Sequence, residues 1–317
     1  MKKSLVSIII VSWNSENFLE DCINSIKHQT YENFEIILVD NVSKDNSVKI
    51  VQDNFPQVKI IENKDNVGFA EGNNIGIKNS NGDLIALVNP DVILEKNWLE
   101  YLVDKIQKND TVGGVTGKMY YLGDKFGKDA VFCTWSKINP YTSIPFNFTN
   151  NEPESKVDYL SGAAMLVKKE VIDKIGFLDP DYFLYFEETD WCARMIRAGY
   201  DLIYVPQAIV WHEVSSTVSD SSKKTYYMER NRIRFAIKNF DTSYLILFLC
   251  YSFLESLFVI LRNQNKNSIQ SKIRIQALNW NFKNFLNTIK SREKYMNILK
   301  KSKFIRSYNN SLPLRKF

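Results

Sequence analysis

Leu-Val-Ser-Ile-Ile-Ile-Val at residues 5–11 is the stretch that decides the class of fold. Nearly continuous apolar, β-branched sequence is typical of a strand buried on both faces of a parallel sheet. A polar break, Ser12 to Ser15, follows it, and residues 16–28 then carry apolar side chains at helical spacing. Further elements are predicted as strands at 34–39, 58–61 and 84–88 and as a helix at 47–54. This repeat of strand, loop and helix predicts a mixed, mostly parallel α/β sheet with helices on both faces.

The composition suits one large domain, or one domain with an appendage. The chain has 317 residues, of which 44% are hydrophobic and 13% aromatic, enough for a sizeable core. Its four cysteines lack paired spacing, which argues against a disulfide framework or a zinc site and fits a reducing compartment. The N-terminus is interpreted as a first strand and not as a secretion signal, because its apolar run is short and interrupted by Ser7.

Charge is distributed unevenly along the chain. Residues 261–317 hold fourteen lysines and arginines and one acid, so this tail carries +13 against +5 for the whole chain, and the rest is acidic. A basic tail of this kind favours a phosphate-rich partner, either anionic lipid or nucleic acid. No recognisable nucleic-acid module accompanies it, so we expect no nucleic-acid partner.

Polar residues follow the predicted strands, where the ligand of such a sheet is expected. The candidate ligand-binding residues are Ser12, Asn14, Asp40, Asn41, Asn89 and Asp91. Neither a Gly-x-Gly-x-x-Gly fingerprint nor a P-loop is present. Asp40 is a plausible acceptor for a base imide or ribose hydroxyl, and a turn or cap role explains it equally well. Asp91 is a hard oxygen ligand suited to Mg²⁺ or Mn²⁺, but it needs a diphosphate and a second protein ligand.

Residues 66–76 form a second unusual stretch, with glycines at spacing four and neighbouring amide side chains. The candidate ligand-binding residues here are Gly68, Gly72 and Asn73. This stretch is predicted to open a helix that runs to about Asn79. Glycine permits close backbone approach, and a helix N-terminus offers N–H groups to a phosphate. An ordinary glycine-rich loop is the alternative.

Three acids follow an aromatic run at residues 182–186: Glu187, Glu188 and Asp190. Thr189 is predicted to cap the helix that starts there, and Gly199 to end it. A carboxylate beside aromatic side chains can be tuned as a proton acceptor, although acids at a helix N-terminus also simply complement its dipole. Asp190 stands four residues before Arg194, which predicts an ion pair and a role as organiser.

Two segments concern the substrate less directly. Residues 157–168 are predicted to form another strand, whose small residues leave room for a substrate or for close packing. Residues 120–156 have little periodicity and are expected to be a surface segment that could cover an acceptor site.

Six motifs occur in the order seen in family 2 glycosyltransferases with the GT-A fold, and the chain resembles the bacterial rhamnosyltransferase-type members. They are Ser7–Asn14, Asp40–Ser47, Asn66–Gly76, Asn89–Asp91, Ser161–Ala163 and Phe186–Arg194. The resemblance covers roughly residues 4–240. It implies a GT-A domain over 1–240, a helical basic region over 241–317, and inverting transfer of a sugar from a nucleotide diphosphate sugar.

The resemblance also assigns roles to single residues. Asp40 matches the acid that contacts the nucleobase. Asn89-Pro90-Asp91 matches the Asp-x-Asp metal motif with Asn in its first place, which leaves Asp91 as the stronger ligand. His212 in Trp211-His212-Glu213 matches the histidine that completes the metal site, and a structural histidine is the alternative.

Glu188 matches the catalytic base, with Glu187 as runner-up. The resemblance implies dTDP-rhamnose, or else a UDP-sugar, as donor and a lipid-linked glycan as acceptor. A catalytically degenerate nucleotide-sugar binder is the alternative, because Asn89 departs from the motif.

Arg230 and Arg234 lie four residues apart on a predicted helix, where they could approach a diphosphate or form a solvated basic face. Residues 244–261 then form an apolar run slightly shorter than the roughly 20 residues that span a bilayer. Glu255 inside it would be costly at the bilayer centre. With the basic tail, this predicts a helix lying in the interface of the inner face of the cell membrane, on a cytoplasmic protein. A helix buried in a homo-oligomer is the alternative.

Overall fold

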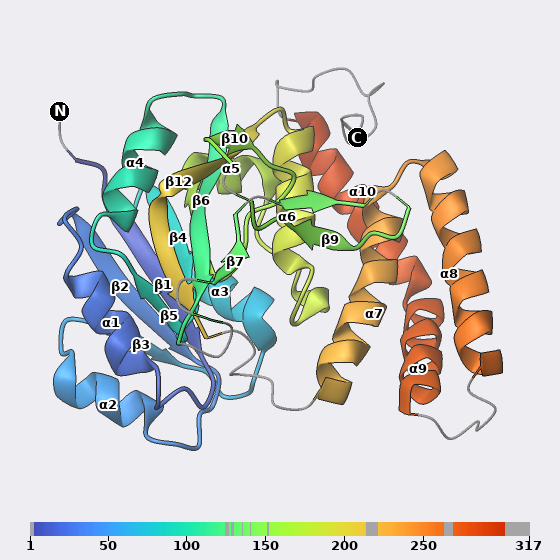
Figure 1. Ribbon diagram of the computed structural model, residues 1–317, viewed down its shortest axis with the longest axis horizontal. Coiled ribbons are helices and arrows are strands. Elements are labelled where there is room, and N and C mark those ends of the chain that lie inside the picture. The colour runs from blue at the N-terminus through green and yellow to red at the C-terminus, as the bar shows by residue number, and fades with distance from the viewer. Residues whose placement is uncertain are drawn as a thin grey trace.

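A mixed β-sheet lies between two layers of helices (Figure 1), in a computed structural model that describes residues 3–123, 127, 130–134, 136–139, 141–150, 152–213, 221–262 and 269–301. The strands are β1 Val6–Ser12, β2 Phe34–Asp40, β3 Lys59–Glu62, β4 Leu84–Val88, β5 Val92–Leu94, β6 Val112–Tyr121, β7 Val131–Cys133, β8 Ser136–Ile138, β9 Pro145–Asn147, β10 Ser155–Lys156, β11 Ala164–Lys168 and β12 Asp201–His212. The helices are α1 Leu19–Lys27, α2 Ser47–Asn54, α3 Gly68–Lys78, α4 Trp98–Gln107, α5 Lys169–Ile175, α6 Glu187–Arg197, α7 Ser221–Asn239, α8 Thr242–Arg262, α9 Ile269–Lys283 and α10 Phe285–Lys301.

The main sheet has the order β10-β12-β6-β11-β4-β1-β2-β3, with β5 paired to β12 and β7 to β6. Its two longest ladders, β6 with β12 and β1 with β2, are parallel, whereas β11 runs antiparallel to both β4 and β6. Strands β8 and β9 form a separate two-stranded sheet within residues 120–156. The predicted mixed, mostly parallel sheet is therefore confirmed.

Side chains of β1 alternate between two cores. Ile9 and Val11 join the core under α3, α5, α6 and α7, while Ile8 and Ile10 join the core under α1, α2 and α4. A strand buried on both faces in this way needs the apolar run that opens the sequence.

The predicted strand at 157–168 is only half right, because regular pairing begins at Ala164. Before it, Leu160 donates its N–H to the sulfur of Cys192 (3.3 Å), and Ala164 donates its N–H to the carbonyl of Ser161 (3.3 Å). The small residues predicted to lie inside a strand therefore form a turn at the end of the sheet.

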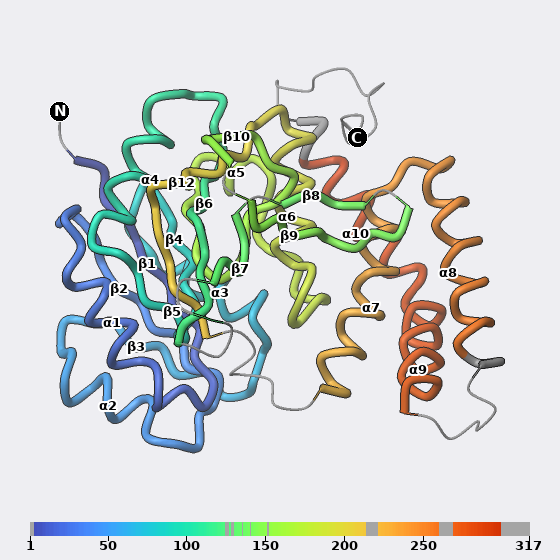
Figure 2. Tube along the Cα trace, viewed as in Figure 1, coloured from blue at the N-terminus to red at the C-terminus, as the bar shows by residue number. Residues whose placement is uncertain are grey.

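Helices α7 to α10 follow the sheet in sequence. Figure 2 shows α8 at the right edge of the view, and α10 packs against α5, α6 and α7. The predicted C-terminal helices are thus present, although residues 263–268 and 302–317 of the basic tail lie outside the described residues. Within the described part of the chain, α8 alone has a stretch, Thr242–Val259, long and apolar enough to cross a bilayer, with mean hydropathy 1.6.

Candidate active site

The carboxyl ends of β1, β2 and β4 form the edge at which the polar candidates gather. Ser12 and Asp40 are paired in register at the ends of their strands, and Asn89 to Asp91 follow β4 directly. Asn89 donates its backbone N–H to the carbonyl of Ala163 (2.8 Å), which brings the end of β4 next to the turn before β11.

Asp40 and Asn14 organise the loops at this edge. The carboxylate of Asp40 accepts hydrogen bonds from the hydroxyl and backbone N–H of Ser43 (2.5 and 2.9 Å). Asn14 adopts a φ of 52° and accepts from the N–H of Lys44 (2.8 Å). These are the contacts of the turn role that the sequence left open for Asp40, and its contact with a nucleobase stays a prediction.

The N-terminus of α3 is already capped by the protein, so the expectation of free N–H groups for a phosphate is wrong there. Phe69 and Ala70 donate their N–H groups to the carbonyl of Phe183 (2.7 and 3.3 Å), and Gly68 donates to the side chain of Asn66 (3.0 Å). Asn41 also donates its side-chain N–H to the carbonyl of Gly68 (3.1 Å). These contacts fix the helix start against the loop that leads into α6.

The glycines of α3 allow close packing. A Cβ on Gly72 would lie 2.8 Å from Val11, so only glycine lets α3 approach β1 this closely. Gly68 has a φ of +81°, and a Cβ there would lie 2.5 Å from the carbonyl oxygen of Phe183. Asn73 is buried and bonds the carbonyl of Phe69 (2.9 Å) within its own helix.

Asp91 and His212 meet at the same edge. Nε2 of His212 lies 3.3 Å from Oδ1 of Asp91, both side chains are buried, and the N–H of Glu213 bonds the carbonyl of Asp91 (2.9 Å). The antiparallel pairing of β5 with β12 creates this contact by placing His212 opposite Val92. Two residues 121 positions apart in sequence thus come together as the metal hypothesis requires.

Several buried polar atoms at this edge have no hydrogen-bond partner among the described residues. They are Oγ of Ser12, Oδ1 of Asn89 and Nδ1 of His212. Buried polar atoms are rarely left unsatisfied, so they fit a site that is completed by a ligand. Within the described ranges no group of three or more His, Cys, Asp or Glu side chains could hold a metal ion, so Asp91 and His212 would need ligand oxygens to complete a coordination shell.

The loop before α6 has an unusual backbone. Phe183, Tyr185 and Phe186 all have positive φ values (65°, 68° and 73°), a region that aromatic residues rarely adopt. The helix begins at Glu187, and Phe186 occupies its N-cap position. The predicted Thr189 cap is therefore wrong, because Thr189 lies inside the first turn, whereas Gly199 follows the end of the helix with φ +91° as expected.

Glu187 and Glu188 are two adjacent acids in a desolvated setting. Oε2 of each is buried without a hydrogen-bond partner in the described part of the chain. Burial, together with the charge of Glu188, raises the pKa of Glu187 well above its ordinary value. Burial raises the pKa of Glu188 to about 7, which suits a group that must accept a proton near neutral pH.

Tyr185 lies in the loop just before the two acids. Burial and the charges of Glu187, Glu188 and Asp91 raise the pKa of Tyr185 to about 12. The side chain of Glu188 packs next to Gly162, where an added Cβ would lie 3.5 Å from its Cγ, and the neighbouring Ala163 carbonyl accepts the N–H of Asn89 (2.8 Å). Sequence reasoning gave Tyr185 no role, because an aromatic run reads as core and no glycine or asparagine signals the positive φ values.

Asp190 holds neighbouring side chains in place, as its four-residue spacing from Arg194 indicated. Its carboxylate, fully buried, accepts from Arg194 Nε (3.0 Å) and Asn239 Nδ2 (2.8 Å) and lies 3.0 Å from Lys238 Nζ. Although burial opposes ionisation, Lys238 and Arg194 hold the pKa of Asp190 below its ordinary value. A carboxylate fixed in this way is not available as a base.

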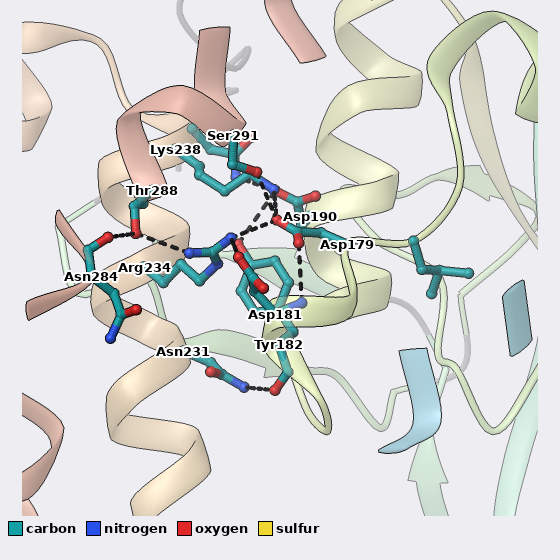
Figure 3. Close-up of polar contacts among 12 residues, drawn as sticks. Asp179, Asp181, Tyr182, Asp190, Asn231, Arg234, Lys238, Asn284, Thr288 and Ser291 are labelled. Carbon is teal, nitrogen blue, oxygen red and sulfur yellow. Dashed lines mark hydrogen bonds and ion pairs between the residues drawn. The ribbon is translucent and has the colours of Figure 1, made fainter. Parts of the chain in front are cut away.

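Arg234 does not reach a diphosphate, and that hypothesis is wrong for this residue. Its guanidinium is fully buried and bonds Asp179 (2.9 Å), Asp181 (2.7 Å) and Thr288 (2.9 Å), as Figure 3 shows. Lys238 and Ser291 reach the same carboxylate of Asp179. This network joins α7 and α10 to the loop before α6.

Arg230 is buried too, so neither the diphosphate role nor a solvated basic face describes it. Its guanidinium carbon lies 4.8 Å from the ring centre of Tyr227 and 4.4 Å from that of Trp280. Its Nη2 donates to the carbonyls of Asp181 (2.9 Å) and Tyr182 (2.5 Å).

The family model of glycosyl transferase family 2 matches residues 7–176. The chain is 33% identical to glycosyltransferase GlyG of Streptococcus pneumoniae over 183 residues, 55% of this chain and 60% of that protein. It is 24% identical to the N-acetylglucosaminyl-diphospho-decaprenol L-rhamnosyltransferase of Mycobacterium tuberculosis over 241 residues, 68% of this chain and 78% of that protein.

Among solved structures, that of GalNAc-T7 with UDP, GalNAc and Mn²⁺ is similar, with a TM-score of 0.65 at 16% identity over 91% of this chain and 58% of that one. A likeness at this identity supports the fold, which is the GT-A fold. Because the family model covers more than half of the 317 residues, the chain belongs to glycosyl transferase family 2.

Proposed function

We propose that this protein transfers a sugar from a nucleotide diphosphate sugar to a hydroxyl of a lipid-linked cell-surface glycan precursor, with inversion at the anomeric carbon. Rhamnose from dTDP-rhamnose is the first candidate donor, supported by the Mycobacterium tuberculosis relative and by the Asn89-Pro90-Asp91 variant of the metal motif. A UDP-sugar is the second candidate, supported by the UDP named with the GalNAc-T7 structure.

The observation that carries the proposal is the position of Glu188. Its Oε2 is buried without a hydrogen-bond partner among the described residues, and its side chain packs next to Gly162, beside the Ala163 carbonyl that accepts the N–H of Asn89 (2.8 Å). Glu188 takes the proton from the acceptor hydroxyl while that oxygen attacks the anomeric carbon. The bond between the anomeric carbon and the diphosphate oxygen breaks in the same displacement, and the electron pair leaves with the diphosphate. Glu187 is the alternative base, and burial together with the charge of Glu188 raises its pKa well above the ordinary value.

Asp91 and His212 are the residues that would hold Mg²⁺ or Mn²⁺, since a carboxylate and an imidazole both ligate these ions. Their 3.3 Å contact and the unsatisfied Nδ1 of His212 among the described residues support this assignment. The ion would supply positive charge against the departing diphosphate.

A groove between α7 and α9 supports a large acceptor with a charged head. It has a volume of about 530 Å³ and combines two aromatic rings with lysines and amides. Its lining residues are Ser222, Lys223, Tyr226, Ile273, Gln276, Asn279, Trp280 and Lys283. Aromatic faces stack on sugar rings, and lysines attract phosphate.

The exposed stripe of α8 supports a position on the inner face of the cytoplasmic membrane. Ile246, Leu247, Phe253 and Leu254 are all exposed, and Phe253 is 68% exposed. Glu255, whose charge would be costly at the centre of a bilayer, is turned away from this stripe and bonds Arg232 (2.8 Å) and Arg274. Flotation with vesicles of mixed neutral and anionic lipid tests this part, and association into homo-oligomers without vesicle binding would support the alternative.

Activity is tested with the purified full chain and a panel of nucleotide sugars, with and without Mn²⁺. Transfer or slow donor hydrolysis that needs the cation supports the proposal. Donor binding without turnover under any condition would instead mark a catalytically degenerate binder.

A further inference from the structure

The loop that delivers the candidate base holds a conformation that its own sequence disfavours. Residues 183, 185 and 186 are aromatic, yet all three have φ between 65° and 73°. Non-glycine residues in this region cost free energy and persist only where the surrounding structure fixes them. Because Glu187 follows immediately, whatever holds the loop also sets the position of both acids.

Asn231 of α7 holds this loop through its backbone. Its side chain is fully buried, and the two hydrogens of Nδ2 are shared among the carbonyls of Tyr182 (2.9 Å), Leu184 (2.8 Å) and Tyr185 (2.7 Å). Figure 3 shows the contact with Tyr182. One amide group thus reaches from Tyr182, just before the first strained residue, to Tyr185, just before the N-cap of α6.

Neighbouring groups keep the Asn231 side chain in place. Arg230 donates from Nε to its Oδ1 (2.7 Å), and Arg230 is itself stacked on Trp280. Asn281 of α9 donates to the carbonyl of Arg230 (2.9 Å). The amide orientation that presents Nδ2 to the loop is therefore fixed by two helices.

Every carbonyl from Asp181 to Tyr185 accepts a hydrogen bond from another element. Arg230 and Asn231 of α7 reach those of Asp181, Tyr182, Leu184 and Tyr185, and the start of α3 reaches that of Phe183. We propose that Asn231 is a positioning residue for transfer, holding the strained loop that places Glu187 and Glu188 where their carboxylates are desolvated. This inference rests on the proposed function, and it makes α7 a part of the catalytic apparatus.

The test is Asn231→Asp in the full chain, an isosteric change that removes the N–H donors and sets a carboxylate against three carbonyl oxygens. We expect kcat to fall on the order of 10²-fold, as small misplacements of a catalytic group cause. The Kd of the donor should change less than about threefold, because Asn231 has no part in donor binding. Hydrogen exchange of backbone amides 183–190 should become faster.

Asn74→Asp is the matched control. Asn74 is also a buried amide that exchanges hydrogen bonds with backbone, donating to the carbonyl of Leu178 (3.0 Å) and accepting from its N–H (3.0 Å). It lies on α3 and does not bond residues 181–186. We expect kcat within about threefold of the wild type and unchanged exchange in the loop.

The proposal is overturned if Asn231→Asp retains kcat and loop protection, or if Asn74→Asp loses both to the same extent. If Asn231→Asp does not fold, Arg230→Lys removes the bond that orients Asn231 together with the bonds of Arg230 to the carbonyls of Asp181 and Tyr182, and it must show the same pattern of lower kcat, faster exchange and retained donor Kd. Absence of turnover in the wild type with every donor would refute the proposed function, and the exchange comparison would still decide the role of Asn231.

Discussion

Replacing Glu188 by glutamine should strongly slow transfer and at the same time stabilise the protein at alkaline pH. The two side chains have the same shape, so the change removes one ionisable proton acceptor and little packing. As loss of a general base, it should lower kcat on the order of 10²-fold or more while donor binding is retained.

The stability effect follows from burial. The pKa of Glu188 is about 7 in the folded protein against an ordinary value of 4.5, a difference worth about 3 kcal/mol. Because the folded pKa is raised, its contribution to stability is fully present below pH 4.5 and is lost as the pH rises through 7. Glutamine never ionises. The free energy of unfolding of the variant should therefore be up to about 3 kcal/mol higher than that of the wild type at pH 8, and equal to it at pH 4.

Urea denaturation at pH 4 and pH 8 measures the difference, alongside transfer rates with a saturating donor. The wild-type rate should rise with pH through about 7, as the base loses its proton. Glu20→Gln is the control, since Glu20 is an exposed acid on α1 far from the loop in sequence. It should change neither the rate nor the pH dependence of stability.

Two results would refute this reasoning. If Glu187→Gln is inactive and Glu188→Gln is active, the base has been assigned to the wrong acid. If Glu188→Gln is no more stable than the wild type at pH 8, the carboxylate is not desolvated as the structure indicates.

Other perturbations test the remaining parts of the site. Asp91→Asn and His212→Gln should each lower transfer on the order of 10²-fold and abolish its response to added Mn²⁺, measured by titrating the cation after chelation. Arg234→Met should lower the free energy of unfolding by about 3–5 kcal/mol by leaving buried carboxylates uncompensated, and an unchanged melting temperature would contradict the network. Gly68→Ala should cost at least about 1 kcal/mol in urea denaturation, because its φ of +81° and the nearby carbonyl leave no room for a Cβ. Phe253→Ser should weaken flotation with anionic vesicles by about tenfold without lowering the melting temperature, since its ring is exposed.

Local sequence was sufficient to predict those elements and contacts that depend on residues a few positions apart. The apolar run at 5–11 predicted a doubly buried strand, which β1 confirms, and the predicted strand at 84–88 coincides with β4. The four-residue spacing of Asp190 and Arg194 predicted their ion pair because a helix brings such positions together. The length and apolarity of α8 could likewise be read directly.

The candidate site could be located, but its contacts could not be predicted. Nothing near Arg234 in sequence indicates that Asp179, 55 residues earlier, takes its charge. The same holds for Phe183, whose carbonyl caps α3 from more than 100 residues away in sequence. The sequence predicted a ligand as the partner of Arg234 and of the N-terminus of α3, because sequence spacing gives no information about distant neighbours.

The sequence by itself determined the sheet, its two cores and the edge at which acids and amides gather, since strand periodicity and the burial of apolar side chains act over a few residues. Only the tertiary structure decided that an aromatic loop adopts positive φ values and that Glu187 and Glu188 stand desolvated at its end. The physical reason is that a strained backbone is stable only when distant donors satisfy it. Here those donors come from α3 and α7, which are brought to the loop by the packing of the whole chain.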